Sequence, residues 1–314
     1  MTSIRFADVI IVGGGPGGIA AAIWCERVAL RWILLEKEDI LGGQLAMIHT
    51  RIPDYPGGIY PSGAALRQQL ETHLSMLQVE NNIVLNQEVQ SIDTTQEILS
   101  VETKAGQRFR STTLIIASGV QRRQLRHHGI SDFIHKGVSY TASGAIDNFR
   151  QRPTAIIGGG DGALENALKL AKICPIVHLI YRKKTLRARQ HFIDQAQQQS
   201  NIFFHPQSTL TTIKGTDWIE NISIQTPSGS QDLEVSALLI KIGFTPAVHI
   251  PGMNIEQQST GHIVISPTQR TTDPRIWAIG DVCSDLDPSL SLAIGQASVA
   301  VRDIERFLYN RPKN

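Results

Sequence analysis

The sequence predicts an α/β fold with two parallel sheets, because one strand–turn–helix–strand pattern occurs twice along the chain. The first copy joins a β-branched strand over 7–12 to a second strand over 32–35 through a run of glycines. The second copy joins a strand over 154–157 to one over 176–181 in the same way. A helix between two such strands returns the chain so that they run parallel, which is the βαβ unit. Two units predict two Rossmann-like nucleotide-binding domains of the three-layer ββα type.

Length and composition agree with two domains. The chain has 314 residues, of which 41% are hydrophobic and 18% charged, and its formal net charge is +2. At roughly 150 residues per domain this length gives about two domains. The high hydrophobic fraction excludes a disordered chain, and the nearly neutral net charge gives no reason to expect nucleic acid as a partner. Three cysteines, Cys25, Cys174 and Cys283, are too few and too far apart for a disulfide scaffold or a four-cysteine metal site.

No segment has the composition of a targeting or membrane signal. The first apolar run, over 7–12, is shorter than the core of a signal peptide and leads directly into glycines. No apolar run approaches the ~18 residues that a membrane helix needs. We therefore expect a soluble protein of the cytoplasm, a reducing compartment, with no membrane insertion.

The remaining elements follow from apolar spacing. Leucines at helical spacing predict a helix over 63–77, and a last helix is expected over 291–308. Strands are expected at three short apolar runs and across one longer region that turns interrupt: 83–85, 98–102, 114–118 and 201–242. Periodicity leaves open which domain receives the residues after 245.

The first glycine turn has the pattern of a dinucleotide cradle. Gly13, Gly15 and Gly18 form G-x-G-x-x-G between a strand and a helix. The first glycine permits the tight turn, the second lets a pyrophosphate approach the backbone, and the third lets helix and strand pack closely. Glu36 ends the next strand, where a carboxylate accepts hydrogen bonds from a ribose. A purely structural glycine turn is the alternative.

The second glycine turn differs at the position of the acid. Gly158, Gly160 and Ala163 form G-x-G-x-x-A, and aligning the two copies puts Tyr181 where Glu36 stands. Four basic residues follow at once: Arg182, Lys183, Lys184 and Arg187. Removing the acid and adding cations favours a 2′-phosphate, and therefore NADP(H) over NAD(H). A solvated basic turn is the alternative.

Further motifs carry a resemblance to a known family. They are spread along the chain: Gly42–Leu45, Ile52–Gly57, Ala117–Gly119, Ile242–Pro246 and Ala278–Val282. With the two glycine turns and Arg182-Lys183, they make the chain similar, almost from end to end, to the low-molecular-weight thioredoxin reductases. These are class II pyridine nucleotide-disulfide oxidoreductases.

The resemblance implies a discontinuous FAD-binding domain over 1–119 and 245–314, with an NAD(P)H-binding domain over 120–244 inserted in it, and a homodimer. The FAD-contacting residues that it implies are Gly13, Gly15, Pro16, Gly18, Glu36, Gly43, Gln44, Leu45, Asp54, Gly119, Gly280, Asp281, Ser289 and Leu290. Those for NADPH are Gly158, Gly160, Asp161, Ala163, Arg182, Lys183 and Arg187.

Two of these assignments carry a physical expectation. Asp281 would bind the phosphate–ribityl part of FAD, and a turn aspartate is its alternative. The last helix would direct its N-terminal amides, near Ser289 and Leu290, at the flavin edge where negative charge builds on reduction. The family's Arg-Gln-Ala is replaced there by Pro288-Ser289-Leu290.

The family's active-site dithiol is missing. After Gly137-Val138-Ser139, the positions of the two cysteines hold Thr141 and Gly144, and Ala145 replaces the acid. A relay to disulfides needs an attacking thiolate and a resolving thiol. Of the other cysteines, we expect Cys25 to be buried in a helix and Cys174 to lie on a surface loop. Cys283 could approach the flavin.

Tyr140 gives the chain a partial likeness to ferredoxin/flavodoxin–NADP reductases of the thioredoxin reductase type, which also lack the dithiol and share Gly-Val-x-Tyr. Those relatives carry an extra C-terminal segment over the flavin, whereas this chain ends soon after its last helix. Packing at a domain boundary is the alternative for Tyr140.

The expected function is an FAD-dependent NADPH oxidoreductase that passes electrons from flavin directly to an external acceptor. No side chain is catalytic, because hydride transfer belongs to the cofactors. Candidate acceptors are ferredoxin, flavodoxin, a ferric chelate, free flavin, a quinone or oxygen. A thioredoxin or disulfide reductase and a non-catalytic flavin- or nucleotide-sensing dimer are the alternatives. Hinges are expected at Gly119-Val120 and Gly243-Phe244, and no histidine, His127 and His128 included, has metal-ligand spacing.

Overall fold

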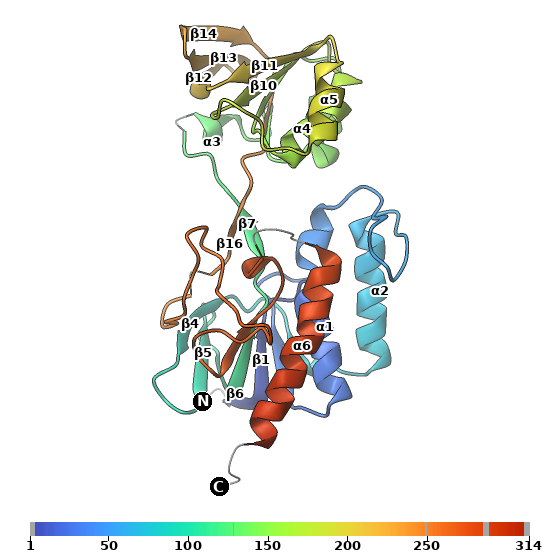
Figure 1. Ribbon diagram of the computed structural model, residues 1–314, viewed down its shortest axis with the longest axis vertical. Helices are drawn as coiled ribbons and strands as arrows, with labels where there is room; N and C mark the ends of the chain where they lie inside the picture. The colour runs from blue at the N-terminus through green and yellow to red at the C-terminus, as the bar shows by residue number, and fades with distance from the viewer. Residues whose placement is uncertain (1–3, 128, 249, 285–288, 311–314) are drawn as a thin grey trace. The chain divides into compact units, whose positions relative to one another are not determined.

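A computed structural model describes residues 4–127, 129–248, 250–284 and 289–310 (Figure 1). The chain divides into two compact units. Unit 1 contains residues 1–121 and 245–314, and unit 2 contains residues 122–244. Two short strands at the boundaries, β7 (Val120–Arg122) and β16 (Phe244–Pro246), pair with each other.

Unit 1 is built on a mixed sheet with the order β3-β2-β1-β6-β5-β4, in which β17 also pairs with β6. Its parallel strands are β1 (Arg5–Val12), β2 (Trp32–Leu35), β3 (Ile83–Val84), β6 (Arg108–Ile116) and β17 (Ile276–Ala278). The strands β4 (Val89–Asp93) and β5 (Leu99–Thr103) continue the sheet as antiparallel neighbours. All four residues of β2 are buried, which is typical of a parallel strand covered on both faces.

Helices cover one face of this sheet: α1 (Pro16–Arg27), α2 (Gly63–Met76) and α6 (Leu290–Tyr309). Figure 1 shows α6 running beside α1, and Ala297, Val301 and Ile304 of α6 share one core with Ile19 and Cys25 of α1. The pairing of β17 with β6 and this packing place the C-terminal residues in unit 1. Periodicity in the sequence alone does not decide that placement.

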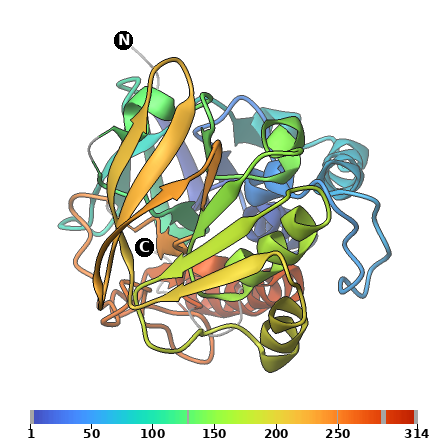
Figure 2. The same ribbon diagram turned by 90° about the horizontal axis from the view of Figure 1, so that it is seen from above.

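Unit 2 has a parallel sheet with the order β11-β10-β9-β15-β8. Its strands are β8 (Val138–Ser139), β9 (Thr154–Ile157), β10 (Val177–Tyr181), β11 (Ile202–Pro206) and β15 (Ala237–Ile240). One face packs against α4 (Asp161–Ala171) and α5 (Gln190–Gln197). The other packs against an antiparallel sheet of β12 (Thr209–Gly215), β13 (Ile219–Thr226) and β14 (Gly229–Glu234), as Figure 2 shows from above.

Short helices complete the connections. They are α3 (Ile130–Phe133) and the 3-10 helices η1 (Gly43–Met47), η2 (Glu80–Asn82), η3 (Ser143–Asn148) and η4 (Gly280–Val282). Of the described helices, none is long and apolar enough to cross a membrane.

Element boundaries follow local chemistry. The helix expected over 63–77 is α2, and the hydroxyl of Ser62 caps it by accepting from the Ala65 amide. The last helix begins at Leu290, where Ser289 caps it by accepting from the Leu292 amide. The strand expected over 114–118 begins earlier, at Arg108, because its polar first half pairs with β5.

Candidate functional site

The first glycine turn joins β1 to α1, and each of its motif glycines has a distinct steric role. Gly13 has φ of +107°, and a Cβ there would lie 2.5 Å from the Ala117 carbonyl oxygen. A Cβ on Gly18 would collide with the carbonyl oxygen of Gly13, so this glycine permits the packing of helix on strand. A Cβ on Gly15 would meet no protein atom within 4 Å. The protein therefore leaves open space at the middle glycine of the motif, the position where the pattern predicts close approach of a pyrophosphate.

A cavity of about 930 Å³ opens beside this turn, and every residue that lines it belongs to unit 1. The residues lining it include Gly13, Gly15, Pro16, Glu36, Gly43, Gln44, Leu45, Asp54, Gly119, Gly280, Asp281, Ser289 and Leu290. The set of FAD contacts named from the sequence is thus gathered around one cavity, except for Gly18, which packs beneath it. The volume lies in the upper range of small-molecule and cofactor sites.

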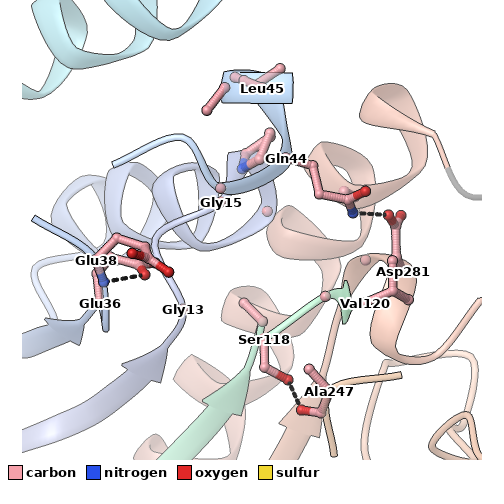
Figure 3. Close-up of a pocket in the computed structure, with 18 of the residues that line it drawn as sticks. Gly13, Gly15, Glu36, Glu38, Gln44, Leu45, Ser118, Val120, Ala247 and Asp281 are labelled. Atoms are coloured by element: carbon pink, nitrogen blue, oxygen red, sulfur yellow. Dashed lines mark hydrogen bonds between the residues drawn. The ribbon is translucent and has the colours of Figure 1, made fainter. Parts of the chain in front are cut away.

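Glu36 is buried at the end of β2 and holds the glycine turn. Its Oε2 accepts from the Gly14 amide at 2.5 Å. Its Oε1 accepts from the Glu38 amide at 3.0 Å (Figure 3). Glu38 and Gln87 also line this end of the cavity, and sequence reasoning misses both because neither belongs to a motif. The carbonyl oxygen of the Gln87 side chain accepts from the Thr103 hydroxyl at 2.7 Å, which fixes its orientation.

Asp281 lies on the opposite wall, in η4. Figure 3 shows Gln44, in η1, pointing toward it, and the Gln44 Nε2 donates to Asp281 Oδ2 at 2.7 Å. Burial raises the pKa of Asp281, while the Gln44 amide and the charge of His262 act in the opposite direction. The side chain therefore faces the cavity with a hydrogen-bond partner beside it, in contrast to a solvent-exposed turn aspartate.

The N-terminus of α6 reaches the same cavity through Ser289 and Leu290. Nearly two turns further on, the side-chain oxygen of Gln296 accepts from the Gly280 amide at 2.7 Å, which ties the helix to η4. The departure at Pro288 lies outside the described residues.

Cys283 lies close to this region, but in a hydrophobic core and not in the cavity. The side chain is buried, does not line the cavity, and donates to the Gly280 carbonyl oxygen at 3.2 Å. Burial raises its pKa to about 12. A thiol that stays protonated is a poor nucleophile at neutral pH.

In unit 2, the second glycine turn joins β9 to α4 with the same division of roles. A Cβ on Gly158, whose φ is +150°, would collide with the Lys241 carbonyl oxygen, whereas one on Gly160 would meet no protein atom within 4 Å. The first turn of α4 has no side-chain cap, so its amides are available to an anion. Ala163 is buried against the turn.

Asp161 begins α4 and is held by Arg189, a residue that no sequence motif singled out. Its Oδ1 accepts from the Arg189 amide and its Oδ2 from the Arg189 Nε, each at 2.7 Å. Asp161 therefore fixes the loop after β10 against the glycine turn. A carboxylate at a helix N-terminus is itself favourable.

The basic cluster directly follows β10. Its four cations are exposed and form no ion pair with any described carboxylate: Arg182, Lys183, Lys184 and Arg187. The Arg187 amide donates to the Gly159 carbonyl oxygen at 2.8 Å, which returns this segment to the glycine turn. The cluster and the turn thus lie side by side at the carboxyl edge of the sheet.

The region of the missing dithiol follows β8, and Tyr140 is fixed there by hydrogen bonds. Its hydroxyl accepts from the Leu125 amide at 3.2 Å, and its carbonyl oxygen accepts from Arg122 Nη1 at 2.8 Å. These contacts agree with a packing role. The amide of Thr141 donates to Ser139 Oγ at 3.1 Å, and Gly144 lies in η3.

The expectation that Cys174 lies on the surface is wrong. Its side chain is buried because the chain after α4 turns inward, and the thiol donates to the Phe149 carbonyl oxygen at 3.1 Å. Cys25 is buried as expected, and burial raises its pKa well above the usual range. The three thiols lie in three separate cores. No group of three metal-ligating side chains occurs among the described residues.

Comparison with known proteins identifies the family. The model of the pyridine nucleotide-disulphide oxidoreductases matches residues 7–303. The chain belongs to this family. Thioredoxin reductase from Chlamydia trachomatis is 30% identical to this oxidoreductase, over 97% of this chain and 99% of that protein. Ferredoxin–NADP reductase from Sulfurisphaera tokodaii is 28% identical, over 96% and 93%. The crystal structure of Lactococcus lactis thioredoxin reductase matches with a TM-score of 0.84 and 28% identity, over 97% of this chain and all of that one.

Family membership confirms three expectations: the resemblance itself, the two-domain Rossmann-type fold and the class of FAD-dependent NAD(P)H oxidoreductases. Thioredoxin reductases and ferredoxin–NADP reductases of this family use FAD and NADPH, which confirms the cofactor prediction at the level of the family. Because the identities to the two groups are nearly equal, the choice between their acceptors rests on the residues of the dithiol region.

Proposed function

We propose that this oxidoreductase binds FAD in unit 1 and NADPH in unit 2, and that electrons pass from the flavin directly to an external acceptor without a thiol relay. One observation supports the last part most strongly. Thr141 and Gly144 stand where the family's cysteines stand, and the three thiols of the chain are buried in separate cores. A disulfide relay needs two thiols that can approach each other.

The residues of unit 1 fit FAD. The open face of Gly15 and the uncapped first turn of α1 suit its pyrophosphate, and Glu36 at the end of β2 suits an adenosine ribose. Asp281 and Gln44 would hold the phosphate–ribityl part, and the N-terminus of α6 would favour negative charge on the flavin ring. When bound, FAD accepts hydride from the nicotinamide and delivers electrons to the acceptor.

The residues of unit 2 fit NADPH. Gly158 and Gly160 form its pyrophosphate cradle, and Asp161 anchors the loop that carries the basic cluster beside it. Arg182, Lys183 and Arg187 have no carboxylate partner among the residues that the structure describes and would take the 2′-phosphate.

The finer parts of the proposal follow the family. A ferredoxin or flavodoxin is the preferred acceptor, since ferredoxin–NADP reductases are among the relatives and this chain holds Thr141 and Gly144 in place of the two cysteines. A cytoplasmic homodimer and hinges at Gly119 and Gly243 belong to the same proposal. Those glycines have positive φ of +64° and +88°, a region that glycine enters at the lowest cost.

Two measurements test the proposal. Anaerobic mixing with NADPH should bleach the visible flavin band, whereas a persistent band would favour a sensing dimer. An acceptor panel of ferredoxin, flavodoxin, ferric chelate, free flavin and quinone should then show turnover with at least one member. Sustained thiol production from thioredoxin in the same preparation would overturn direct transfer.

A further inference from the structure

Lys241 lies at the point where the strand order of unit 2 reverses. It follows β15, which pairs with β9 through Ile240 and Ile157 and with β8 through Leu239 and Ser139. Its amide donates to the Ile157 carbonyl oxygen at 2.7 Å, and its own carbonyl lies against Gly158. Lys241 therefore lies at the carboxyl edge of the sheet, between the glycine turn and the segment that begins at Tyr140.

This edge is where a dinucleotide crosses the sheet. From β9 the chain continues to β10 on one side, whereas β15 and β8 lie on the other, so the switch point falls between β9 and β15. Nucleotides bind in the crevice at such a point. The basic cluster marks the β10 side as the adenosine end, and the nicotinamide half therefore extends toward β15 and Lys241.

Positive charge around Lys241 exceeds negative charge among the described residues. The side chain is partly buried, and no described carboxylate lies within ion-pair distance of its ammonium. Glu165 acts on it from α4, but that carboxylate pairs with Lys169 at 2.7 Å. Arg122, itself partly buried, adds a second positive charge nearby and donates to the Tyr140 carbonyl oxygen at 2.8 Å. Burial and the charge of Arg122 lower the pKa of Lys241.

We propose that Lys241 and Arg122 form a cationic site that makes unit 2 prefer the reduced dinucleotide over the oxidised one. The oxidised nicotinamide ring carries a positive charge and the reduced ring is neutral, whereas the phosphates of the two forms are identical. The two cations attract the phosphates of both forms equally, so this attraction does not change the ratio of the two affinities. Their repulsion of the positively charged oxidised ring weakens binding of the oxidised form alone. The site aids release of the oxidised product. This inference rests on the proposed NADPH site.

The test is calorimetric titration of the flavin-loaded protein with NADP⁺ and with tetrahydro-NADPH, whose reduced ring is neutral and donates no hydride. The Kd for NADP⁺ divided by the Kd for tetrahydro-NADPH should fall by about threefold to tenfold in Lys241→Met, as expected for removing one nearby, partly screened charge. Lys241→Arg keeps the charge and should keep the ratio. Lys172→Met removes an exposed lysine at the far end of α4 and should leave the ratio unchanged.

A third probe, 2′-phospho-ADP-ribose, separates this inference from the function on which it rests. The probe lacks the nicotinamide, so its binding tests the cradle and the basic cluster alone. Failure of the wild-type protein to bind it would refute the NADPH site. Normal binding with an unchanged ratio in Lys241→Met would refute the role of Lys241 and leave the NADPH site standing. Should Lys241→Met not fold, Arg122→Met gives the same comparison with a smaller expected change.

Discussion

Alanine at Gly13 should lower protein stability, whereas alanine at Gly15 should weaken cofactor binding and leave stability nearly unchanged. At Gly13, alanine must adopt φ of +107° and place its Cβ 2.5 Å from the Ala117 carbonyl oxygen. Backbone strain costs about 1–3 kcal/mol and crowding a similar amount. The free energy of unfolding of the flavin-free protein should therefore fall by about 3 kcal/mol or more in Gly13→Ala.

At Gly15 the protein offers no such obstacle. Its φ of −71° and ψ of −178° are open to alanine, and nothing lies within 4 Å of the added carbon. Alanine is a poorer N-cap than glycine, which lowers stability, but it also reduces the conformational entropy of the unfolded chain, which raises stability. The two effects nearly cancel, so the free energy of unfolding should change by less than about 1 kcal/mol. The methyl group would instead occupy the space reserved for the pyrophosphate, and affinity for FAD should fall by more than about tenfold.

The assay is urea unfolding of the flavin-free variants together with FAD titration followed by quenching of flavin fluorescence. Gly15→Ala should unfold like the wild type and bind FAD weakly. The reasoning fails if Gly15→Ala purifies with a full complement of FAD, or if it loses as much stability as Gly13→Ala.

Three further predictions concern other parts of the chain. Replacing Arg182 and Arg187 by alanine should raise KM for NADPH by about tenfold to a hundredfold, because charge-assisted bonds to the 2′-phosphate are lost. KM for NADH should change little. Steady-state kinetics with both nucleotides checks this prediction, and equal effects on the two KM values would contradict it. Cys283→Ser should keep its turnover number with NADPH within about twofold, because a thiol with a pKa of about 12 carries no thiolate at neutral pH; a loss of turnover in a well-folded variant would put the thiol back in the mechanism. Burial and the neighbouring ring of His205 lower the pKa of His178 to about 4. Between about pH 6.5 and 4, the ring is therefore protonated in the unfolded chain and neutral in the folded chain. The contribution of His178 to the free energy of unfolding is therefore complete above about pH 6.5 and is lost as the pH falls. The shift corresponds to about 2 kcal/mol between pH 7 and 5, and because the ring is partly exposed to solvent we expect a loss of about 1 kcal/mol in urea unfolding. His178→Gln should reduce this loss, and an equal loss in the variant would refute the assignment.

Local sequence was sufficient for the glycine turns and the ends of β2 and β10, because strand, turn and helix follow one another within a short span there. Glu36 and the basic cluster were identified in this way, since each directly follows a strand whose end is fixed by the βαβ unit. Gln44 and Asp281 were named only through the resemblance, because the bond between them joins segments far apart in the chain.

Other features depend on long-range packing and had no local signal. The position of Lys241 beside Gly158 comes from the pairing of β15 with β9, and the contact of Asp161 with Arg189 comes from the path of the loop after β10. Cys174 was misplaced because a residue before proline at a helix end is typical of a surface turn, whereas this turn enters the core of unit 2.

The number of electrons that the protein accepts tests most directly whether electrons leave the flavin without a thiol relay. In an anaerobic reductive titration, dithionite should deliver about two electrons per flavin, because no disulfide is present to accept a second pair. Wild-type protein that takes up about four electrons per flavin would contain a redox-active disulfide. That result would contradict direct transfer and would return the chain to the thiol chemistry of its thioredoxin reductase relatives.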